Sequence, residues 1–513
     1  EGADATVAVP QHADGIKFLA INGSVTAFAN FGDIRVHKML GYLPYLLHEN
    51  PQNALVIGLG MGITSQSLML PGIEQVDCVE LNRGVLEAAA NSFADVNNNV
   101  MVQDKLNVII DDGRSYLQTT DKSYDIITSN AVHARLSGNL YTKEFYEICK
   151  DRLTANGVMC QWTSTNWLTP REFKSLITAF QEVFPYTSLW LVNAGHLLMV
   201  GTPGPLSISY TDWQQRLSTP KAQADLAEYS LGSPELLMAH FVVDQEFLPL
   251  FLQNTRPNTD DFPYAEFSRV VSKMQIPEVV LGLIHLKQDL THRLTFKYEV
   301  LDEMVDIKER VSRYAEAEKY YLQGVFAHNF AAEPLLALNM LTEALRLQPD
   351  DYRYREEAAG VNLFLASQNT ISEQEMLIFL DNAIAHLENM VTYQPNFAFD
   401  WTNLGFVYMN RGYLEKAKDA FYRAIELAPE VPMPRIYLAS ILGGEGNLDE
   451  AEQQLITAVQ HFPDEIEAYY RLGLVYELKG ESENARQAYL QVVEQIETYR
   501  DASLRLQRLQ KTD

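Results

Sequence analysis

The sequence predicts two kinds of structure in one chain: an α/β domain with a doubly wound sheet and an N-terminal β-hairpin, and then an all-α solenoid of repeats. Three observations predict this. Apolar runs alternate with helical stretches between residues 46 and 270, which is the rhythm of a parallel sheet covered by helices. An Asn-Gly pair near the amino end joins two apolar stretches and favours a hairpin. Small and aromatic residues recur every 34 positions near the carboxyl end.

Length and composition set the first limits on function. The 513 residues are 47% hydrophobic and 21% charged, which are globular values, and a prior of about 150 residues per domain predicts two to four domains. The net charge of −27 argues against nucleic acid or an anionic membrane as the main partner, because both would be repelled. It is compatible with cationic small molecules or basic protein partners, and also with a solvated acidic surface that serves solubility alone.

The cysteines and the apolar runs exclude further classes. Cys78, Cys149 and Cys160 show neither CxxC nor CxxH spacing, so neither a disulfide framework nor a metal site is indicated, and a reducing compartment is the simpler inference. No apolar run reaches about 18 residues, so the sequence predicts no membrane span in this chain. It begins without Met or a signal peptide, which suggests a processed or excised piece of a longer protein.

The elements of the α/β part follow in order. Residues 1–45 contain the hairpin, which turns at Asn22-Gly23, and a helix then runs to Pro51. The sheet domain spans residues 46–270, and a helical connector covers residues 271–312. Its predicted strands are the apolar runs "NALVIGLG", "QVDCVEL", "LNVIIDDG", "YDIITSN", "GVMCQW", "TSLWLV" and "HLLMVGT".

Residues 313–513 are predicted to form about five helical hairpins. In "FDWTNLGFVYMNRGYLEKAKDAFYRAIELAPE" the small and aromatic positions follow the tetratricopeptide pattern, and shifts of 34 residues reproduce it twice. Two weaker units that end at Pro349 and Pro395 precede these three. Such a stack buries its core only between neighbouring units, and its concave face is usually a docking surface for a peptide or protein.

Three features at successive strand ends point to a nucleoside. Gly58, Gly60 and Gly62 follow a buried strand and open a helix, so that the backbone can approach a ligand closely. Glu80 ends the next strand, where a carboxylate can accept both ribose hydroxyls. Asp112, before Gly113 in a sharp turn, ends the third strand and is placed to accept from an adenine amino group. The alternative is a purely structural role. Ser65 replaces the third glycine of a dinucleotide motif, which favours a sulfonium nucleoside.

From about residue 5 to 270 the chain resembles the spermidine synthase-like (polyamine aminopropyltransferase) family. The matching stretches are "LGYLPYLLHENPQNALVIGLGMGIT", "VDCVELNRGVLEAA", "VIIDDGRSYL", "NLYTKEFYEICKDRL", "GVMCQW" and "NTDDFPYAEFS". The resemblance implies a Rossmann-like fold of the S-adenosylmethionine-methyltransferase type. It also implies that Glu80 holds the ribose and Asp112 the adenine of decarboxylated S-adenosylmethionine.

The amine half of the family pattern differs here. Met61 stands where spermidine synthases have an acid that holds the aminopropyl amine, and Asn130 and His133 replace the two acids of the catalytic loop. His37 lies in the segment that corresponds to the family's Tyr-His-Glu motif. A polyamine needs carboxylates to neutralise its ammonium groups, which Asn130 cannot provide. His133 is the candidate base, and Arg135 suits a carboxylate or phosphate acceptor. Structural roles for His37, His133 and Arg135 remain open.

Three hypotheses follow. The first is a transferase of the aminopropyltransferase fold that uses decarboxylated S-adenosylmethionine or S-adenosylmethionine, with a repeat array that docks a protein or peptide. The second is a methyltransferase that uses the same pocket. The third is a non-catalytic scaffold with a degenerate synthase domain. A homo-oligomer is possible. The nucleoside and the unpaired cysteines favour the cytoplasm, whereas relatives with membrane spans leave a membrane-associated or periplasmic piece open.

Overall fold

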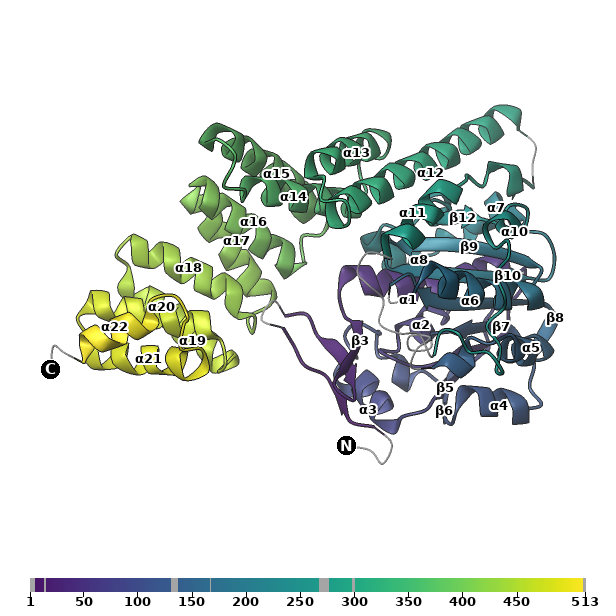
Figure 1. The fold of residues 1–513 in the computed structure, drawn as a ribbon, viewed down its shortest axis with the longest axis horizontal. Coiled ribbons are helices and arrows are strands. Elements are labelled where there is room, and N and C mark those ends of the chain that lie inside the picture. Colours follow the sequence, from purple (N-terminus) through teal and green to yellow (C-terminus); the bar gives the residue numbers. More distant parts are fainter. Residues whose placement is uncertain are drawn as a thin grey trace. The chain divides into compact units, whose positions relative to one another are not determined.

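The computed structural model divides the chain into two compact units (Figure 1). It describes residues 5–12, 15–130, 137–166, 168–266, 276–297 and 300–510. The sheet unit comprises residues 1–10 and 17–354, and the helical unit comprises residues 11–16 and 355–513. Each unit has its own core, and each is described separately.

An eight-stranded mixed sheet forms the centre of the sheet unit, with the strand order β12-β9-β10-β8-β7-β4-β5-β6. The parallel strands are β4 Asn53–Ile57, β5 Gln75–Glu80, β6 Leu106–Ile110, β7 Tyr124–Ser129 and β8 Leu153–Ser164. The antiparallel strands are β9 Tyr186–Asn193, β10 His196–Thr202 and β12 Phe241–Val243. The predicted α/β fold is thus confirmed, although the sheet is parallel only over β4 to β8.

The order of the parallel strands places a topological switch point between β4 and β7. From β4 the chain moves outward to β5 and β6, then returns to the other side of β4 as β7 and continues to β8. Beyond the carboxyl ends of β4 and β7 the chain therefore continues to opposite sides, toward β5 from β4 and toward β8 from β7. Open α/β sheets bind ligands in the crevice that such divergence leaves.

Helices cover both faces of this sheet (Figure 1). Those of the sheet domain are α1 Phe31–Leu47, α2 Ile63–Ser67, α3 Arg83–Asn91, α4 Gly113–Thr119, α5 Lys143–Asp151, α6 Pro170–Val183, α7 Tyr210–Leu217, α8 Pro220–Leu226, α9 Pro234–Met238, α10 Leu248–Phe251 and α11 Ile276–Leu286. Short 3-10 helices occur at Val100–Val102, Gly138–Leu140, Ala227–Tyr229 and Thr291–Arg293. The apolar side chains of α1 and α3 share one buried cluster with Val56, Val76 and Cys78 of the strands.

The amino-terminal hairpin forms as predicted. Strand β2 Phe18–Ile21 pairs antiparallel with β3 Ser24–Phe28, and β1 Val7–Ala8 pairs with β2. The turn residues Asn22 and Gly23 have φ of 52° and 77°, the left-handed geometry that Asn-Gly adopts readily. A further small sheet joins β11 Ile208–Ser209 and β13 Leu294–Thr295 in parallel.

Helix α1 carries several buried polar side chains. Asn30 caps its amino end by accepting from the Asp33 N–H at 2.8 Å. Asp33 in turn accepts from the Phe28 N–H at 2.8 Å, which ties the hairpin to the helix start. Arg35, His37 and Lys38 are all buried. A surface helix would expose such residues, so α1 must supply them with partners inside the protein.

The hydrogen-bond partner of Arg35 and the charged groups around it come from positions far along the chain. The Arg35 Nη2 lies 2.7 Å from His240 Nε2, and Glu318 of α12 Leu301–Asn329 lies beside His240. Arg353 donates to both oxygens of Glu318, at 2.8 and 2.7 Å. Helix α12 and α13 Pro334–Leu347 therefore belong to the sheet unit, which extends to Tyr354. The domain limits that the sequence suggests stay predictions.

The helical unit consists of regular helical pairs. Its helices are α14 Tyr352–Ala366, whose first turn lies in the sheet unit, α15 Glu373–Tyr393, α16 Ala398–Arg411, α17 Leu414–Leu427, α18 Pro432–Gly444, α19 Leu448–His461, α20 Ile466–Lys479, α21 Ser482–Gln495 and α22 Ala502–Leu509. The first helices of three successive pairs begin at 398, 432 and 466, which is the predicted 34-residue period. A Cβ on Gly405 would stand 2.6 Å from Phe421 Cε1, so glycine there permits the two helices of a pair to approach closely.

No helix in the described part of the chain is both long enough and apolar enough to cross a membrane.

Candidate functional site

The glycine turn after β4 has the backbone geometry that its sequence requires. Gly58, Gly60 and Gly62 have φ of 89°, 54° and 83°, which side chains other than glycine's rarely tolerate. The Gly58 N–H donates to Val79 O at 2.8 Å, and the Gly62 N–H donates to Leu59 O at 2.9 Å. Gly58 and Gly60 are partly exposed. The turn therefore presents its backbone at the switch point, where a ligand can approach it.

Asn97 holds this turn in place through a side-chain hydrogen bond. It is fully buried, and its Nδ2 donates to Met61 O at 2.9 Å and to Ala89 O at 2.8 Å. A Cβ on Gly62 would stand 3.1 Å from Asn97 Nδ2. Asn97 could not be predicted from the sequence, because an asparagine among other asparagines in a connecting segment gives no signal of a contact with a distant loop.

Glu80 lies at the carboxyl end of β5 and holds two loops. Its Oε2 accepts from the Leu59 N–H at 2.9 Å, and its Oε1 accepts from the Asn82 N–H at 2.9 Å. Burial raises the pKa of this carboxyl, and the backbone hydrogen bonds oppose the rise. Each carboxylate oxygen can accept more than one hydrogen bond. Glu80 can thus fix the glycine turn and still accept from a ligand hydroxyl.

Asp112 follows β6 and begins helix α4. Its Oδ1 caps the helix by accepting from the Ser115 N–H at 2.9 Å, and its side chain is only partly buried. Gly113 is required for a different reason from the sharp turn that the sequence analysis expects. A Cβ there would stand 2.6 Å from Ile57 Cγ2, so glycine lets α4 pack closely against β4.

Two apolar side chains at the same edge are exposed. Leu81 follows Glu80 directly and is 63% exposed, and Ile110, the last residue of β6, is 41% exposed. Glu80 and Ile110 are register partners on neighbouring strands. Neither was among the predicted site residues, although an apolar residue next to an acid at a strand end can indicate a ligand-binding surface. Their apolar surface suits a flat, apolar ligand ring.

On the other side of the switch point, Asn130 meets helix α1. The Asn130 Nδ2 lies 3.0 Å from His37 Nδ1 and is the atom nearest to a Cβ built on Gly60, at 3.7 Å. Burial lowers the pKa of His37 to about 4, with Asp33 opposing the shift and His196 adding to it. His37 is therefore a neutral imidazole near pH 7 that accepts at Nδ1 from the Asn130 amide.

His196 of β10 provides a second imidazole, half-buried, beside the first. Its Nδ1 accepts from the Trp162 Nε1–H at 3.0 Å, and its Nε2 lies 3.8 Å from Asp33 Oδ1. Burial lowers the pKa of His196, and Asp33 opposes the shift. Since an indole nitrogen only donates, Nε2 carries the proton of the neutral ring. The link of His196 to Asp33 depends on a contact between β10 and α1, which the sequence gives no means to predict.

The remaining predicted site residues have varied placements. His133 and Arg135 lie outside the described residues. Met61 has no exposed surface and packs in the core cluster. Near Asp112, Arg114 of α4 forms an ion pair with Asp260. Asp261 is exposed beside it.

One group of possible metal ligands lies elsewhere among the described residues. Asp244, Glu246 and His292 bring their ligand atoms within 4.8 Å of one another. Arg293 forms ion pairs of 2.6 Å with both carboxylates. A guanidinium that already neutralises these two acids works against a cation at the same place.

Comparison with known families fits this arrangement. The spermine/spermidine synthase domain family matches residues 33–197, which contain the glycine turn, Glu80, Asp112 and Asn130. Tetratricopeptide repeat families match residues 401–431 and 438–500. The chain carries a spermine/spermidine synthase domain followed by tetratricopeptide repeats. The family resemblance that the sequence motifs indicate is thus confirmed.

Curated relatives of the synthase domain are similar over part of their length. A polyamine aminopropyltransferase of Bacillus cytotoxicus is 26% identical over 159 residues, which cover 31% of this chain and 58% of the relative. Polyamine aminopropyltransferase 2 of Hyperthermus butylicus is 30% identical over 180 residues, 34% of this chain and 59% of the relative. The chain therefore spans less than two thirds of these relatives. A spermidine synthase structure from Thermotoga maritima aligns with a TM-score of 0.42 and 20% identity, over 49% of this chain and 85% of that one.

Proposed function

We propose that the synthase domain is a transferase that takes an aminopropyl group from decarboxylated S-adenosylmethionine. The observation that carries the proposal is the convergence of the glycine turn, Glu80 and Asp112 at the carboxyl ends of β4, β5 and β6, beside the switch point of the sheet. The curated relatives are polyamine aminopropyltransferases, which supports the same reaction class.

The residues at this edge fit a nucleoside in shape and polarity. Glu80 retains acceptor capacity for ribose hydroxyls after binding Leu59 and Asn82. Asp112 uses Oδ1 for its helix cap, so Oδ2 is proposed to accept from the adenine amino group. Leu81 and Ile110 are proposed to flank the adenine ring, because exposed apolar side chains gain most when a flat ring covers them.

The chemistry is a displacement at a carbon next to sulfur. The sulfonium of the bound co-substrate makes that carbon electrophilic, a new C–N bond forms to the acceptor amine as the C–S bond breaks, and sulfur leaves as the thioether methylthioadenosine. The domain itself supplies alignment and exclusion of water. The proton that the acceptor nitrogen loses must pass to a base. His133 is the candidate from the sequence, and His37 is a neutral imidazole beside Asn130.

The acceptor is proposed to differ from the multiply charged amines that polyamine synthesis uses. Asn130 and His37 contribute no negative charge, and Asp33 is the carboxylate that faces His196 beside them. A diamine leaves a second ammonium that such a site does not neutralise. An acceptor that is neutral, anionic or singly charged suits these residues better.

The helical unit is proposed to bind a basic protein segment. Between residues 355 and 513 the sequence has 25 Asp or Glu against 13 Lys or Arg, a difference of −12. Tyr393, Tyr413 and Tyr422 are between 39% and 52% exposed. An acidic surface with exposed tyrosines favours cationic side chains through charge and cation–π contacts.

Isothermal calorimetry with decarboxylated S-adenosylmethionine, S-adenosylmethionine and methylthioadenosine tests the proposal. We expect saturable binding of the decarboxylated form and of methylthioadenosine, and loss of both in Glu80→Ala. Glu74→Ala, which removes an exposed carboxylate just before the same strand, is the matched control and should bind as wild type. Preference for intact S-adenosylmethionine would instead support methyl transfer. Binding of none of the three would leave the repeat array as the functional part.

A further inference from the structure

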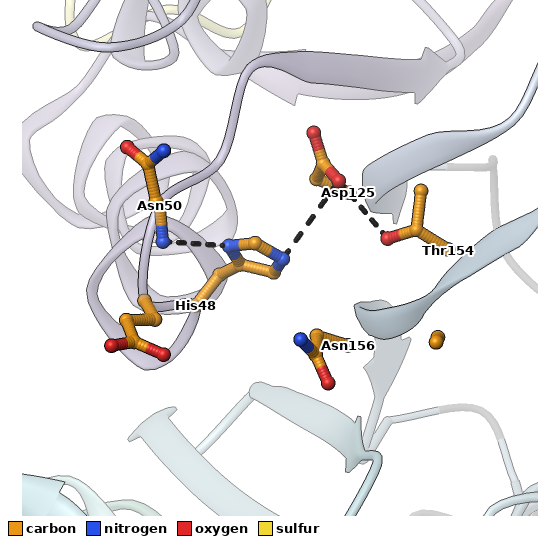
Figure 2. A pocket seen from close by; sticks show the side chains of 7 residues that line it. His48, Asn50, Asp125, Thr154 and Asn156 are labelled. Atoms are coloured by element: carbon orange, nitrogen blue, oxygen red, sulfur yellow. Dashed lines mark hydrogen bonds and ion pairs between the residues drawn. The ribbon is translucent and has the colours of Figure 1, made fainter.

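An open cavity of about 330 Å³ lies where β7 and β8 begin, on the edge of the sheet opposite the glycine turn. Its walls come from the three residues that follow α1, the second residue of β7 and the second to fourth residues of β8, and nearly all of its lining side chains are polar (Figure 2). Neither the synthase chemistry nor the repeat array uses this cavity. Its lining contains two carboxylates, from Glu49 and Asp125, and no Lys or Arg.

His48 offers a buried proton donor to this cavity. Its side chain is only 7% exposed, and its Nδ1 accepts from the Asn50 N–H at 3.1 Å. Nε2 must therefore carry the proton of the neutral ring. Burial lowers the pKa of His48, with Asp125 opposing the shift, so the ring is neutral near pH 7. Among the described residues Nε2 has no hydrogen-bond partner, which is a costly state for a buried donor.

Asp125 offers an acceptor to the same space. Its Oδ2 accepts from the Gln52 and Asn53 N–H groups at 2.9 and 3.0 Å, and its Oδ1 accepts from Thr154 Oγ1 at 3.0 Å. Burial alone would raise the pKa of Asp125, but these hydrogen bonds outweigh burial and lower it. The carboxylate is thus ionised and held in place, and Oδ1 can accept a further hydrogen bond.

The donor and the acceptor face each other across a gap. His48 Nε2 and Asp125 Oδ1 are 3.9 Å apart, which is too far for a hydrogen bond between them. Figure 2 shows the imidazole directed at Asp125, with Asn156 beside the gap. One atom that both accepts and donates would satisfy both groups. A hydroxyl group has this property.

We propose that this cavity binds a small polyhydroxylated molecule, a sugar or polyol, with one hydroxyl bridging His48 Nε2 and Asp125 Oδ1. Asn50, Asn156 and Glu49 supply further donors and acceptors around the opening. A volume of about 330 Å³ falls at the small end of ligand pockets. The site lies on the far edge from the proposed nucleoside site and does not depend on it.

Other ligand classes fit these groups less well. His48 cannot coordinate a metal ion through a free nitrogen lone pair, because Nδ1 accepts from the Asn50 N–H and Nε2 is protonated, so a cation would leave the Nε2–H without an acceptor. An ammonium could donate to Asp125 but would leave the His48 Nε2–H without an acceptor. An anion would meet two carboxylates and no cationic lining residue.

The wall that carries His48 is fixed before any ligand arrives. Arg216 Nη1 donates to the carbonyl oxygens of Tyr45 and His48 at 2.7 and 2.8 Å, and Arg216 Nη2 donates to Glu49 O. These bonds hold the last carbonyl groups of α1 in place. A preorganised wall lowers the entropy cost of binding a small ligand.

Saturation-transfer NMR on the full chain tests the proposal with D-glucose, sorbitol and putrescine as probes. His48→Asn keeps an acceptor for the Asn50 N–H and removes the Nε2–H, whereas His48→Gln keeps a donor near the Nε2 position. We expect glucose or sorbitol to bind wild type, to bind about tenfold more weakly to His48→Asn, and to bind His48→Gln at an intermediate level. His292→Asn, a partly exposed histidine at another cavity, is the matched control and should equal wild type.

Asn156→Ala provides a second variant that touches only an exposed lining residue, and it should also weaken the sugar or polyol signal. Melting temperatures establish that each variant is folded. The absence of any glucose or sorbitol signal from wild type would overturn the proposal, as would a signal that survives both His48→Asn and Asn156→Ala. A putrescine signal that is lost in His48→Asn, without a sugar signal, would assign the cavity to a cation instead and overturn the hydroxyl bridge.

Discussion

Glu80 and Asp112 stand on one side of the switch point as carboxylates that accept backbone N–H groups, whereas His37 and His196 stand on the other side as neutral imidazoles near one carboxylate, Asp33. The first group forms the proposed nucleoside side and the second, with Asn130, the proposed acceptor side. Glu80 and His37 are buried, whereas Asp112, Asn130, His196 and Asp33 are partly exposed.

The two sides differ in what holds their polar groups in place. On the nucleoside side each carboxylate is fixed by N–H groups of the loops it serves, at 2.9 Å in each case. On the acceptor side the contacts run between side chains of distant elements, such as Asn130 with His37. Side chains can be exchanged without disturbing loops, so in the proposed transferase the acceptor side is the half that can change its substrate while the nucleoside side stays fixed.

The largest predicted effect is the response of the acceptor side to acid. The pKa of His37 is about 4 in the folded protein and about 6.5 in an unfolded chain. The unfolded state therefore binds more protons between these values, and stability is present above pH 6.5 and lost as pH falls toward 4. The expected loss is about 3 kcal/mol. Urea unfolding followed by tryptophan fluorescence at pH 7 and pH 4.5 measures it.

His37→Gln isolates this effect from the other buried histidines. Glutamine cannot bind the proton, so we expect the variant to lose less stability than wild type over the same pH range. Asp33 and His196 are present in both proteins. Identical pH profiles for the two proteins would show that His37 does not titrate differently on folding.

The next prediction places a charge on the acceptor side. Asn130→Asp puts a carboxylate beside His37 Nδ1, which raises the pKa of His37 and supplies a partner for an ammonium. We expect putrescine to bind about tenfold more tightly than to wild type, with methylthioadenosine affinity unchanged within about twofold. Calorimetry measures both affinities. The control Asn484→Asp adds the same charge at an exposed position of α21 and should change neither affinity. Unchanged putrescine binding in Asn130→Asp would show that the missing charge at residue 130 does not limit ammonium binding.

Much of the nucleoside side could be predicted because its backbone conformation is determined by residues close together in the sequence. Gly58, Gly60 and Gly62 have positive φ, which a glycine-rich turn after a strand indicates through sterics alone. Asn22-Gly23 forms its hairpin turn and the repeat helices begin at 34-residue intervals for the same reason: the residues that decide the structure lie close together in the sequence.

The acceptor side and the antiparallel strands depend on contacts between residues far apart in the sequence. The spacing of residue types does not predict such contacts. His37 and Asn130 are 93 positions apart, and Trp162 and His196 are 34 apart on antiparallel strands. Burial, rather than residue type, sets the pKa of both histidines. The antiparallel pairing of β9, β10 and β12 likewise follows from packing and not from their apolar patterns.

On the nucleoside side, Asp112→Asn tests recognition of the adenine. Asparagine can still cap α4 through Oδ1, but it removes the charge that accepts from an amino group. We expect methylthioadenosine to bind about tenfold more weakly, because hydrogen bonds to charged groups contribute about 1.5–3 kcal/mol. The preference for methylthioadenosine over methylthioinosine should also disappear. The neighbouring Asp111→Asn is the control, and an equal effect of both substitutions would point to general charge rather than a specific contact.

The smallest predicted effect concerns the apolar flank of the ring. Leu81 is 63% exposed, so Leu81→Ser removes little burial from the folded protein, and we expect the melting temperature to stay unchanged. Covering Leu81 with an adenine ring would bury apolar area worth about 1 kcal/mol, so methylthioadenosine should bind about fivefold more weakly to the variant. Leu301→Ser, at a leucine 73% exposed on α12, should bind as wild type. A lower melting temperature with unchanged affinity would instead mean that Leu81 packs against the protein and not against the ligand.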